Sequence, residues 1–311
     1  MPSQAETVSH LRLASELAGL DVAEVRVPGD RHIVVDGLRL HYLDWGQRAR
    51  PPLLFLHGGR MTAHTWDVVC LTLCSSYHCL ALDLRGHGDS EWSPALDYAL
   101  DAHARDIGGL IRELALERPV LVGQSLGGMS ALAHAAAGAA DELAGVALLD
   151  VGPDVQLQGA RRIIDHVADP GPGPVEDFVR RARARHPQRD PRVLRHSLLH
   201  NLRRLPDATW TWKYDPRRLT PEHFASLMAS LERLHDCAPA IACPVLVVRG
   251  ADSDVLSAEQ AATFAASLPD GRWASVAAAG HNIQVENPRG LVRVLRDFLS
   301  ELAGRPGVGA A

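Results

Sequence analysis

Residues 119–128 read PVLVGQSLGG, an apolar run that leads into a serine with glycines two positions before and two positions after it. Residues 119–122 are typical of a short buried strand, and the alanine-rich stretch 129–140 is typical of a helix. A serine at such a strand-to-helix corner takes a strained, exposed position, which flanking glycines allow the backbone to reach. Backbone N–H groups at the helix start then stabilise negative charge. The pattern therefore predicts that Ser125 is a nucleophile.

Composition excludes several classes of protein. The chain has 311 residues, 46% of them hydrophobic, which fits one large domain or one domain with an insertion. The net charge of −5 does not favour nucleic acid as a partner. No apolar stretch approaches the ~20 residues that span a bilayer, and the N-terminus lacks the pattern of a signal peptide. We therefore expect a soluble, cytoplasmic protein, a monomer or homodimer, that acts on a small molecule.

The cysteines do not indicate a metal site. Their number is odd, and their spacing to histidines is not that of metal ligands. Cys70 and Cys74 lie one helical turn apart in an apolar stretch, so we expect buried free thiols there and no bound metal. The five are Cys70, Cys74, Cys79, Cys237 and Cys243.

Strand and helix patterns alternate along most of the chain, which predicts an α/β fold with a mostly parallel sheet covered on both faces. The alternation begins with a hairpin around Asp36-Gly37, stops after residue 153 and resumes near residue 241. The interruption, residues 154–240, carries helical patterns and predicts an inserted helical cap. We expect a core of 31–153 and 241–303, an N-terminal helical extension of 1–30 with a helix near 7–19, and a flexible tail of 304–311.

Four signposts occur in a characteristic order: His57-Gly58-Gly59, the motif Asp83-x-Arg85-Gly86-His87-Gly88-x-Ser90, the elbow around Ser125, and Gly280-His281. With them the chain resembles an α/β-hydrolase with a cap domain, over roughly residues 30–303. The resemblance implies an eight-stranded, mostly parallel sheet with a helical cap inserted after the sixth strand. It also implies that His281, on the loop after the last strand, is the general base.

The acid that orients His281 has several candidates. The resemblance places it three residues past Gly250, a position that Ser253 occupies here. Asp252 and Asp254 flank that position, each displaced by one residue. Asp150 ends the preceding strand, 25 residues after Ser125, and an aspartate there points into the site that sheet ends create. We favour Asp150, with Asp254 as the alternative and Asp252 behind both.

The resemblance implies an oxyanion hole made of two backbone N–H groups, those of Gly59 and Leu126. His57 and His87 lie in the motifs that carry the resemblance, and we expect both to be structural rather than catalytic.

The predicted cap is basic. Between residues 154 and 235 it carries 14 arginines and Lys213 against ten acidic residues. With Trp210 and Trp212 it would form an aromatic lid that attracts an anionic substrate. The alternative is a solvated face whose aromatic residues pack the cap onto the body. Arg60, His64 and Trp66 are further candidates for the substrate pocket, although Trp66 also suits the core.

These features favour a serine hydrolase that cleaves a small carboxylic ester or lactone through an acyl-enzyme, with no metal or organic cofactor. Hydrolysis of a carbon–carbon bond in a diketone-like acid is the second possibility, although Arg60 stands where a third glycine is usual for that activity. A ligand-binding receptor with slow turnover on the same fold is the third.

Overall fold

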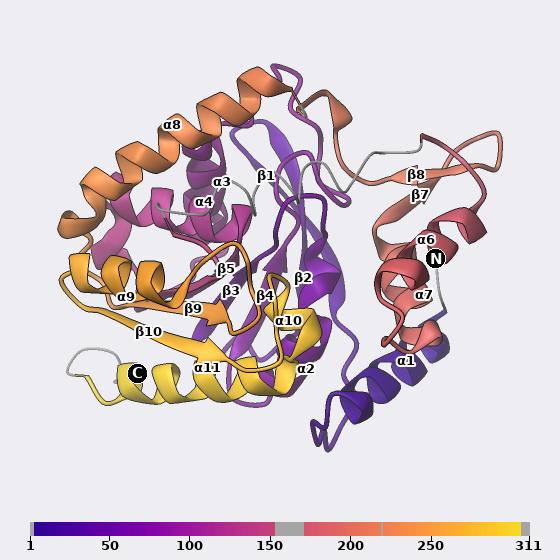
Figure 1. The fold of residues 1–311 in the computed structure, drawn as a ribbon, viewed down its shortest axis with the longest axis horizontal. Coiled ribbons are helices and arrows are strands. Elements are labelled where there is room, and N and C mark those ends of the chain that lie inside the picture. The colour runs from indigo at the N-terminus through magenta and orange to yellow at the C-terminus, as the bar shows by residue number, and fades with distance from the viewer. Residues whose placement is uncertain (1–2, 153–170, 219, 306–311) are drawn as a thin grey trace.

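The computed structural model describes residues 3–152, 171–218 and 220–305. It shows a central sheet with helices on both faces and a smaller group of elements to one side (Figure 1). In the described residues, eight strands form the sheet in the order β1-β2-β4-β3-β5-β6-β9-β10. They are β1 (Gly29–Val35), β2 (Leu38–Asp44), β3 (Pro52–Leu56), β4 (His78–Leu82), β5 (Val120–Gln124), β6 (Gly145–Leu149), β9 (Val245–Gly250) and β10 (Gly271–Val276).

The pairing confirms a mostly parallel sheet. Strand β2 pairs antiparallel with β1 and with β4. The other neighbouring pairs of this sheet, β4-β3, β3-β5, β5-β6, β6-β9 and β9-β10, are parallel. Asp36 and Gly37 join β1 to β2 with φ values of 48° and 81°, the left-handed pair that a tight hairpin turn requires. Strands β3, β4, β5 and β6 are almost completely buried, because helices cover both faces.

Two apolar clusters lie on the two faces of the sheet. One includes residues of α3 (Leu100–Glu113), α4 (Leu126–His134) and α9 (Ala258–Ser267). The other includes residues of α2 (Asp67–Leu73) and α11 (Pro288–Ala303). Leu291, Leu295 and Phe298 of α11 recur at helical spacing and are buried, which holds this helix against the sheet. The short elements are α10 (Ile283–Glu286), η1 (Ala63–Trp66), η2 (Ala135–Ala139), η3 (Ala140–Glu142), η4 (Pro216–Arg218) and η5 (Ala238–Ala240).

The insertion follows β6, the sixth strand, and precedes β9. In its described part it contains α6 (Val175–Arg185), α7 (Pro191–His200), β7 (Leu202–Arg204), β8 (Trp210–Trp212) and α8 (Pro221–Cys237). The sequence patterns predicted helices alone, but β7 and β8 pair as an antiparallel hairpin. Strands of three residues are too short to produce a visible alternation of polar and apolar positions. Residues 153–170 of the predicted cap lie outside the described residues.

The insertion divides between two cores. Phe178 and Leu198 belong to a small apolar cluster that joins α6, α7 and the hairpin. Leu231 and Leu234 of α8 instead belong to the cluster of α3 and α4, and Figure 1 shows α8 lying along the body of the molecule. The helix α8 of the predicted cap therefore packs on the body of the molecule rather than on the rest of the insertion.

The N-terminal extension forms α1 (Gln4–Leu17), which begins at a capping box made by Ser3 and Glu6. This helix contacts α2 of the body and α7 of the insertion. Its His10 ring stacks on His196 of α7 at 3.6 Å between centroids. Residues 306–311 of the predicted tail lie outside the described residues. Among the helices described, none is long and apolar enough to cross a membrane.

Candidate active site

Ser125 lies between β5 and α4 with φ 50° and ψ −116°, a combination that L-residues rarely adopt. A Cβ on Gly127 would overlap the carbonyl oxygen of Leu56, and one on Gly123 would lie 2.5 Å from the backbone of Gly127. Any side chain at either position would collide with main chain, so this corner requires glycine at both. The strand, the strained serine and the helix together have the geometry of a nucleophile elbow.

Asp150 and His281 come together at the carboxyl ends of the parallel strands. Nδ1 of His281 lies 2.8 Å from Oδ2 of Asp150, whose side chain is fully buried. Asp150 has φ 50°, a left-handed conformation directly after β6. Its Oδ1 accepts a hydrogen bond from the N–H of Gly250 at 3.2 Å. The carboxylate therefore holds the proton of His281 on Nδ1 and leaves Nε2 free to act as a base.

Ser253 links the two segments that contain the candidate acids, the end of β6 and the loop after β9. Its hydroxyl donates a hydrogen bond to Oδ2 of Asp150, the same oxygen that faces His281. The backbone N–H of Asp252 bonds to the carbonyl of Ala279 at 2.9 Å. The loop after β9 thus supplies a hydroxyl that supports the carboxylate at the end of β6.

Gln124 links three parts of the site, and sequence reasoning had not singled it out. Its Nε2 donates a hydrogen bond of 3.1 Å to the carbonyl of His281. Its Oε1 lies so close to Gly58 that a Cβ there would overlap it. The sequence feature that could have indicated this role is the polar residue Gln124 at the end of an otherwise apolar strand, directly before Ser125.

The two predicted oxyanion donors lie on segments that adjoin the elbow. Leu126 is the first residue of α4, where backbone N–H groups have no acceptor within the helix. Gly59 follows β3, and the backbone of Leu56 and His57 in the same segment packs against Gly127. Both main chains therefore border the corner that carries Ser125.

His57 has a structural environment, as predicted. It is fully buried, and burial lowers the pKa of its imidazole below the usual range. Nδ1 donates to the carbonyl of Gly58 at 2.7 Å, and Nε2 accepts from the N–H of Leu84 at 3.0 Å. Both ring nitrogens therefore tie the loop after β3 to the loop after β4.

Asp83 anchors the motif that follows β4. Its carboxylate accepts hydrogen bonds from the N–H groups of Ala63 and Asp89, at 2.6 and 2.9 Å, and faces His41 Nδ1 at 2.7 Å. In the described part of the chain, His41, Asp83 and Asp89 are the group whose potential metal-ligand atoms lie within 4.8 Å of one another. Lys213 Nζ lies 2.6 Å from Asp89. Because these carboxylates already hold cationic and backbone donors, we interpret the group as an ion-pair network.

The three tryptophans proposed for the pocket have packing roles. Trp66 is fully buried, with its ring 5.2 Å from that of Phe55 between centroids, and belongs to the core. Trp212 meets Phe178 edge-to-face at 5.4 Å, and Trp210 packs on the same cluster. Trp210 and Trp212 thus pack within the core of the insertion itself, whereas the sequence had suggested either a lid over the pocket or packing of the cap onto the body.

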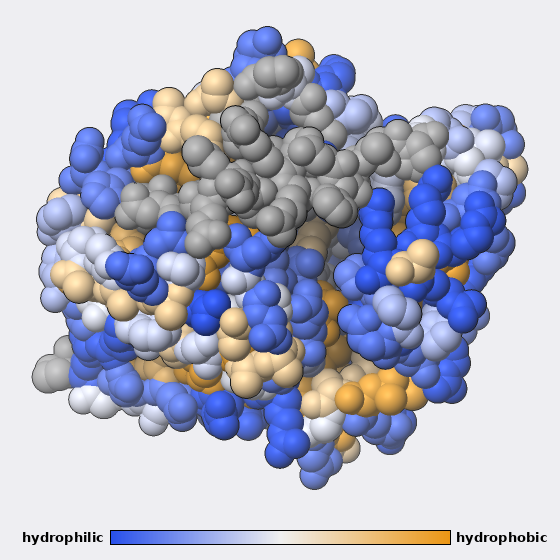
Figure 2. Space-filling model, viewed as in Figure 1, coloured by the Kyte–Doolittle hydropathy of each residue, from blue (hydrophilic) through white to orange (hydrophobic). Residues whose placement is uncertain are grey.

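Arg60 and His64 lie where the body meets the insertion. The guanidinium of Arg60 is 5.8 Å from the ring centroid of Tyr214. His64 Nδ1 is 3.0 Å from Asp67 Oδ2, and its ring stacks on His200 of α7 at 3.6 Å. Figure 2 shows hydrophilic side chains predominating over the region of α6 and α7, in keeping with the basic composition of the insertion.

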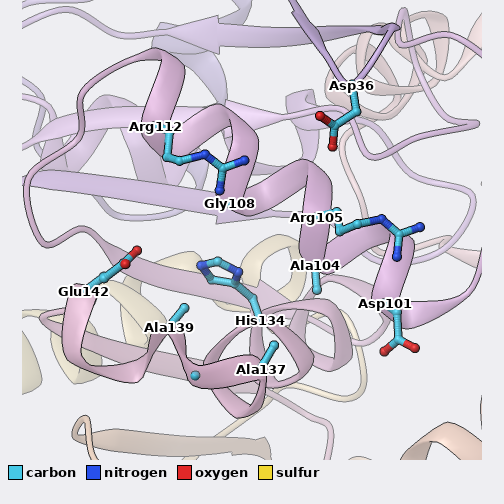
Figure 3. A pocket seen from close by; sticks show the side chains of 11 residues that line it. Asp36, Asp101, Ala104, Arg105, Gly108, Arg112, His134, Ala137, Ala139 and Glu142 are labelled. Atoms are coloured by element: carbon cyan, nitrogen blue, oxygen red, sulfur yellow. The ribbon is translucent and has the colours of Figure 1, made fainter.

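A cavity of about 510 Å³ lies between α3 and η2, away from this site. Charged side chains of both signs line it, among them Arg105, Arg112 and Glu142 (Figure 3). His134 also lines it and ends α4, at the opposite end of that helix from Ser125. The cavity therefore has no part in the arrangement around Ser125 and His281.

Comparisons with known proteins agree with this architecture. The sequence profile of the Alpha/beta hydrolase family matches residues 53–294. Esterase Rv0045c of Mycobacterium tuberculosis is 32% identical over 266 residues, which cover 83% of this chain and 85% of that protein. The 3-hydroxybutyrate-oligomer hydrolase of Cupriavidus necator is 31% identical over 244 residues, or 73% and 82% of the two chains.

A solved structure has the same fold. The crystal structure of esterase Rv0045c superposes with a TM-score of 0.77 at 28% identity, covering 96% of this chain and all of that one. The fold, the elbow and the matched residues lead to one conclusion: this chain belongs to the α/β hydrolase family.

Proposed function

We propose that this protein hydrolyses small carboxylic esters through an acyl-enzyme formed on Ser125. The observation that carries the proposal is the contact of His281 Nδ1 with the buried carboxylate of Asp150, in a chain whose nucleophile elbow is intact. Two relatives that the chain matches over most of its length, an esterase and an ester-oligomer hydrolase, support esters as the substrate class. Lactones contain the same bond and belong to the proposal.

In this mechanism Nε2 of His281 takes the hydroxyl proton as Ser125 attacks the ester carbonyl. The N–H groups of Gly59 and Leu126 stabilise the oxyanion, and each such donor is worth roughly 3 kcal/mol of the barrier. The imidazolium, held by Asp150, then protonates the leaving alcohol. Water activated by His281 finally releases the carboxylic acid and restores Ser125.

The segment between β6 and β9 is proposed as the cap over this site, since it joins two strands whose carboxyl ends carry Asp150 and Gly250. No contact described above favours carbon–carbon bond hydrolysis or a receptor role over ester hydrolysis.

The test combines a fluorophosphonate probe with 4-nitrophenyl esters of increasing acyl length. Wild type should label with the probe and turn over the esters, whereas Ser125→Ala should do neither while it keeps the circular dichroism of wild type. A protein that resists the probe and hydrolyses no ester would contradict the proposal and favour a binding role.

A further inference from the structure

Arg218 is a buried cation beside the proposed oxyanion loop. It ends η4, just before α8, and is only 8% exposed. Its guanidinium lies over the ring of Tyr98, 5.9 Å from the centroid. A Cβ placed on Gly59 would lie 3.9 Å from Nη2 of Arg218. The charged group therefore borders the loop whose N–H is proposed to bind the ester carbonyl oxygen.

The hydrogen-bonding partner of Arg218 is neutral. Nη1 donates to Nε2 of His87, while Nδ1 of His87 lies 3.0 Å from the carbonyl of Arg85 and donates its proton there. His87 is fully buried, and burial together with the neighbouring Arg218 holds the pKa of its imidazole well below the usual range. This contact therefore orients the guanidinium without neutralising its charge.

The acidic residue nearest to Arg218 in the sequence is Asp215, and its carboxylate already accepts hydrogen bonds from other residues. Asp215 accepts three hydrogen bonds from Arg217, one from its backbone N–H at 3.0 Å and two from its guanidinium at 2.8 and 2.7 Å, and a fourth from the hydroxyl of Tyr98. Among the residues that the structure describes, Arg218 makes no ion pair with a carboxylate, and its buried Nε has no acceptor. Burial lowers the pKa of Arg218 to about 10.

A buried guanidinium that forms no ion pair is costly to keep charged, and a carboxylate on a ligand would supply the missing partner. A guanidinium with free N–H donors is suited to bind a carboxylate. We propose that Arg218 binds a carboxylate carried by the substrate, so that the preferred substrates are esters with a free carboxylate in the acyl or alcohol part. This inference rests on the proposed ester hydrolysis and names its substrate class.

The basic composition of the insertion supports the same class independently. The excess of basic over acidic residues between positions 154 and 235 would attract anionic substrates toward the site. Arg218 would then provide the specific contact within it.

The experiment compares mono-4-nitrophenyl adipate with its uncharged isostere, 4-nitrophenyl 6-methylheptanoate. Wild type should have the higher kcat/KM for the anionic ester. Arg218→Met should lower that preference by about 10- to 100-fold, as loss of a charged hydrogen-bonding partner predicts, mainly through KM. Arg218→Lys should keep part of the preference. Arg204→Met removes one exposed arginine from the same insertion and should leave it unchanged.

If Arg218→Met lowered kcat/KM equally for both esters, the proposal would be overturned. Such a result would mean that Arg218 stabilises the oxyanion or the fold rather than a substrate carboxylate. An unchanged preference in a folded Arg218→Met would overturn it as well. A calorimetric titration with adipate separates this inference from ester hydrolysis. If no variant hydrolyses either ester, binding of adipate by wild type and its loss in Arg218→Met would still support the anion site. Absence of adipate binding to wild type would contradict it.

Discussion

The hydroxyl of Ser253 donates a hydrogen bond to Oδ2 of Asp150, the oxygen that also lies 2.8 Å from Nδ1 of His281. Ser253 occupies the position after β9 where the resemblance implied an acid, whereas the carboxylate itself comes from the end of β6. The end of β6 thus supplies the carboxylate, and the loop after β9 supplies a hydroxyl that donates a hydrogen bond to it. The two positions meet because β6 and β9 are adjacent parallel strands whose carboxyl ends share one edge of the sheet.

The first prediction concerns the identity of the acid. Asp150→Asn should reduce kcat by about 10,000-fold, because a neutral amide leaves His281 free to take the wrong tautomer. Asp254→Asn is the matched control and should keep most of the activity. Steady-state kinetics with a 4-nitrophenyl ester would check both variants. The opposite ranking would transfer the role to the loop after β9.

Ser253 should act as a positioning residue. Ser253→Ala removes one hydrogen bond to the buried carboxylate and should lower kcat by about tenfold, the effect of roughly 1.4 kcal/mol. The loss should fall on kcat rather than on KM, because the hydroxyl supports the carboxylate that orients His281. An unchanged kcat would show that the contact is only structural.

The same geometry predicts a rescue. Ser253→Asp in the Asp150→Asn background should recover part of the lost activity, because a carboxylate would return next to His281. The single variant Ser253→Asp places two acids together and should be less active than wild type. No gain of the double variant over Asp150→Asn would show that position 253 does not reach the imidazole.

The ion pair of Arg85 with Asp106 should dominate the stability of the motif after β4. Nε and Nη2 of Arg85 lie 2.6 and 2.7 Å from the two carboxylate oxygens of Asp106, and both side chains are largely buried. Asp106→Asn should lower the free energy of unfolding by about 3–5 kcal/mol, because it leaves a buried cation unpaired. Glu176→Gln breaks an exposed pair with Arg195 and should cost under ~1 kcal/mol. Urea denaturation would compare the two.

The contact between α1 and the insertion should weaken in acid. Burial, then the neighbouring His196, lowers the pKa of His10 to about 3 from the ordinary value of 6.5, and His64 and Arg189 add to this effect. Between pH 3 and pH 6.5 the imidazole of His10 is protonated in the unfolded chain but not in the folded chain. The folded state therefore loses stability as the pH falls from about 6.5 toward 3.

Hydrogen exchange of the α1 amides across this pH range would check that prediction. Protection in wild type should fall as the pH falls. His10→Gln removes the titrating group and should flatten the dependence without abolishing it, since the pKa of His196 is also lowered by burial. Identical pH dependence in the two proteins would contradict the assignment to His10.

The sequence by itself determined the α/β fold class, the mostly parallel sheet with its insertion, and the position of the elbow. These features depend on residues close together in the chain: an apolar strand, glycines that main-chain contacts require, and a helix directly after Ser125. The hairpin turn at Asp36 and Gly37 was equally local.

Only the tertiary structure decided which aspartate faces His281, because Asp150, Asp252 and Asp254 have similar local surroundings in sequence. The choice depends on two strand ends that lie about a hundred residues apart in the chain meeting at one edge of the sheet. The burial of Arg218 depends on contacts with three separate segments, those that carry Gly59, His87 and Tyr98, so composition could suggest a basic insertion but could not single out this residue. Local geometry is encoded in neighbouring residues, whereas burial and pairing of charges are properties of the assembled fold.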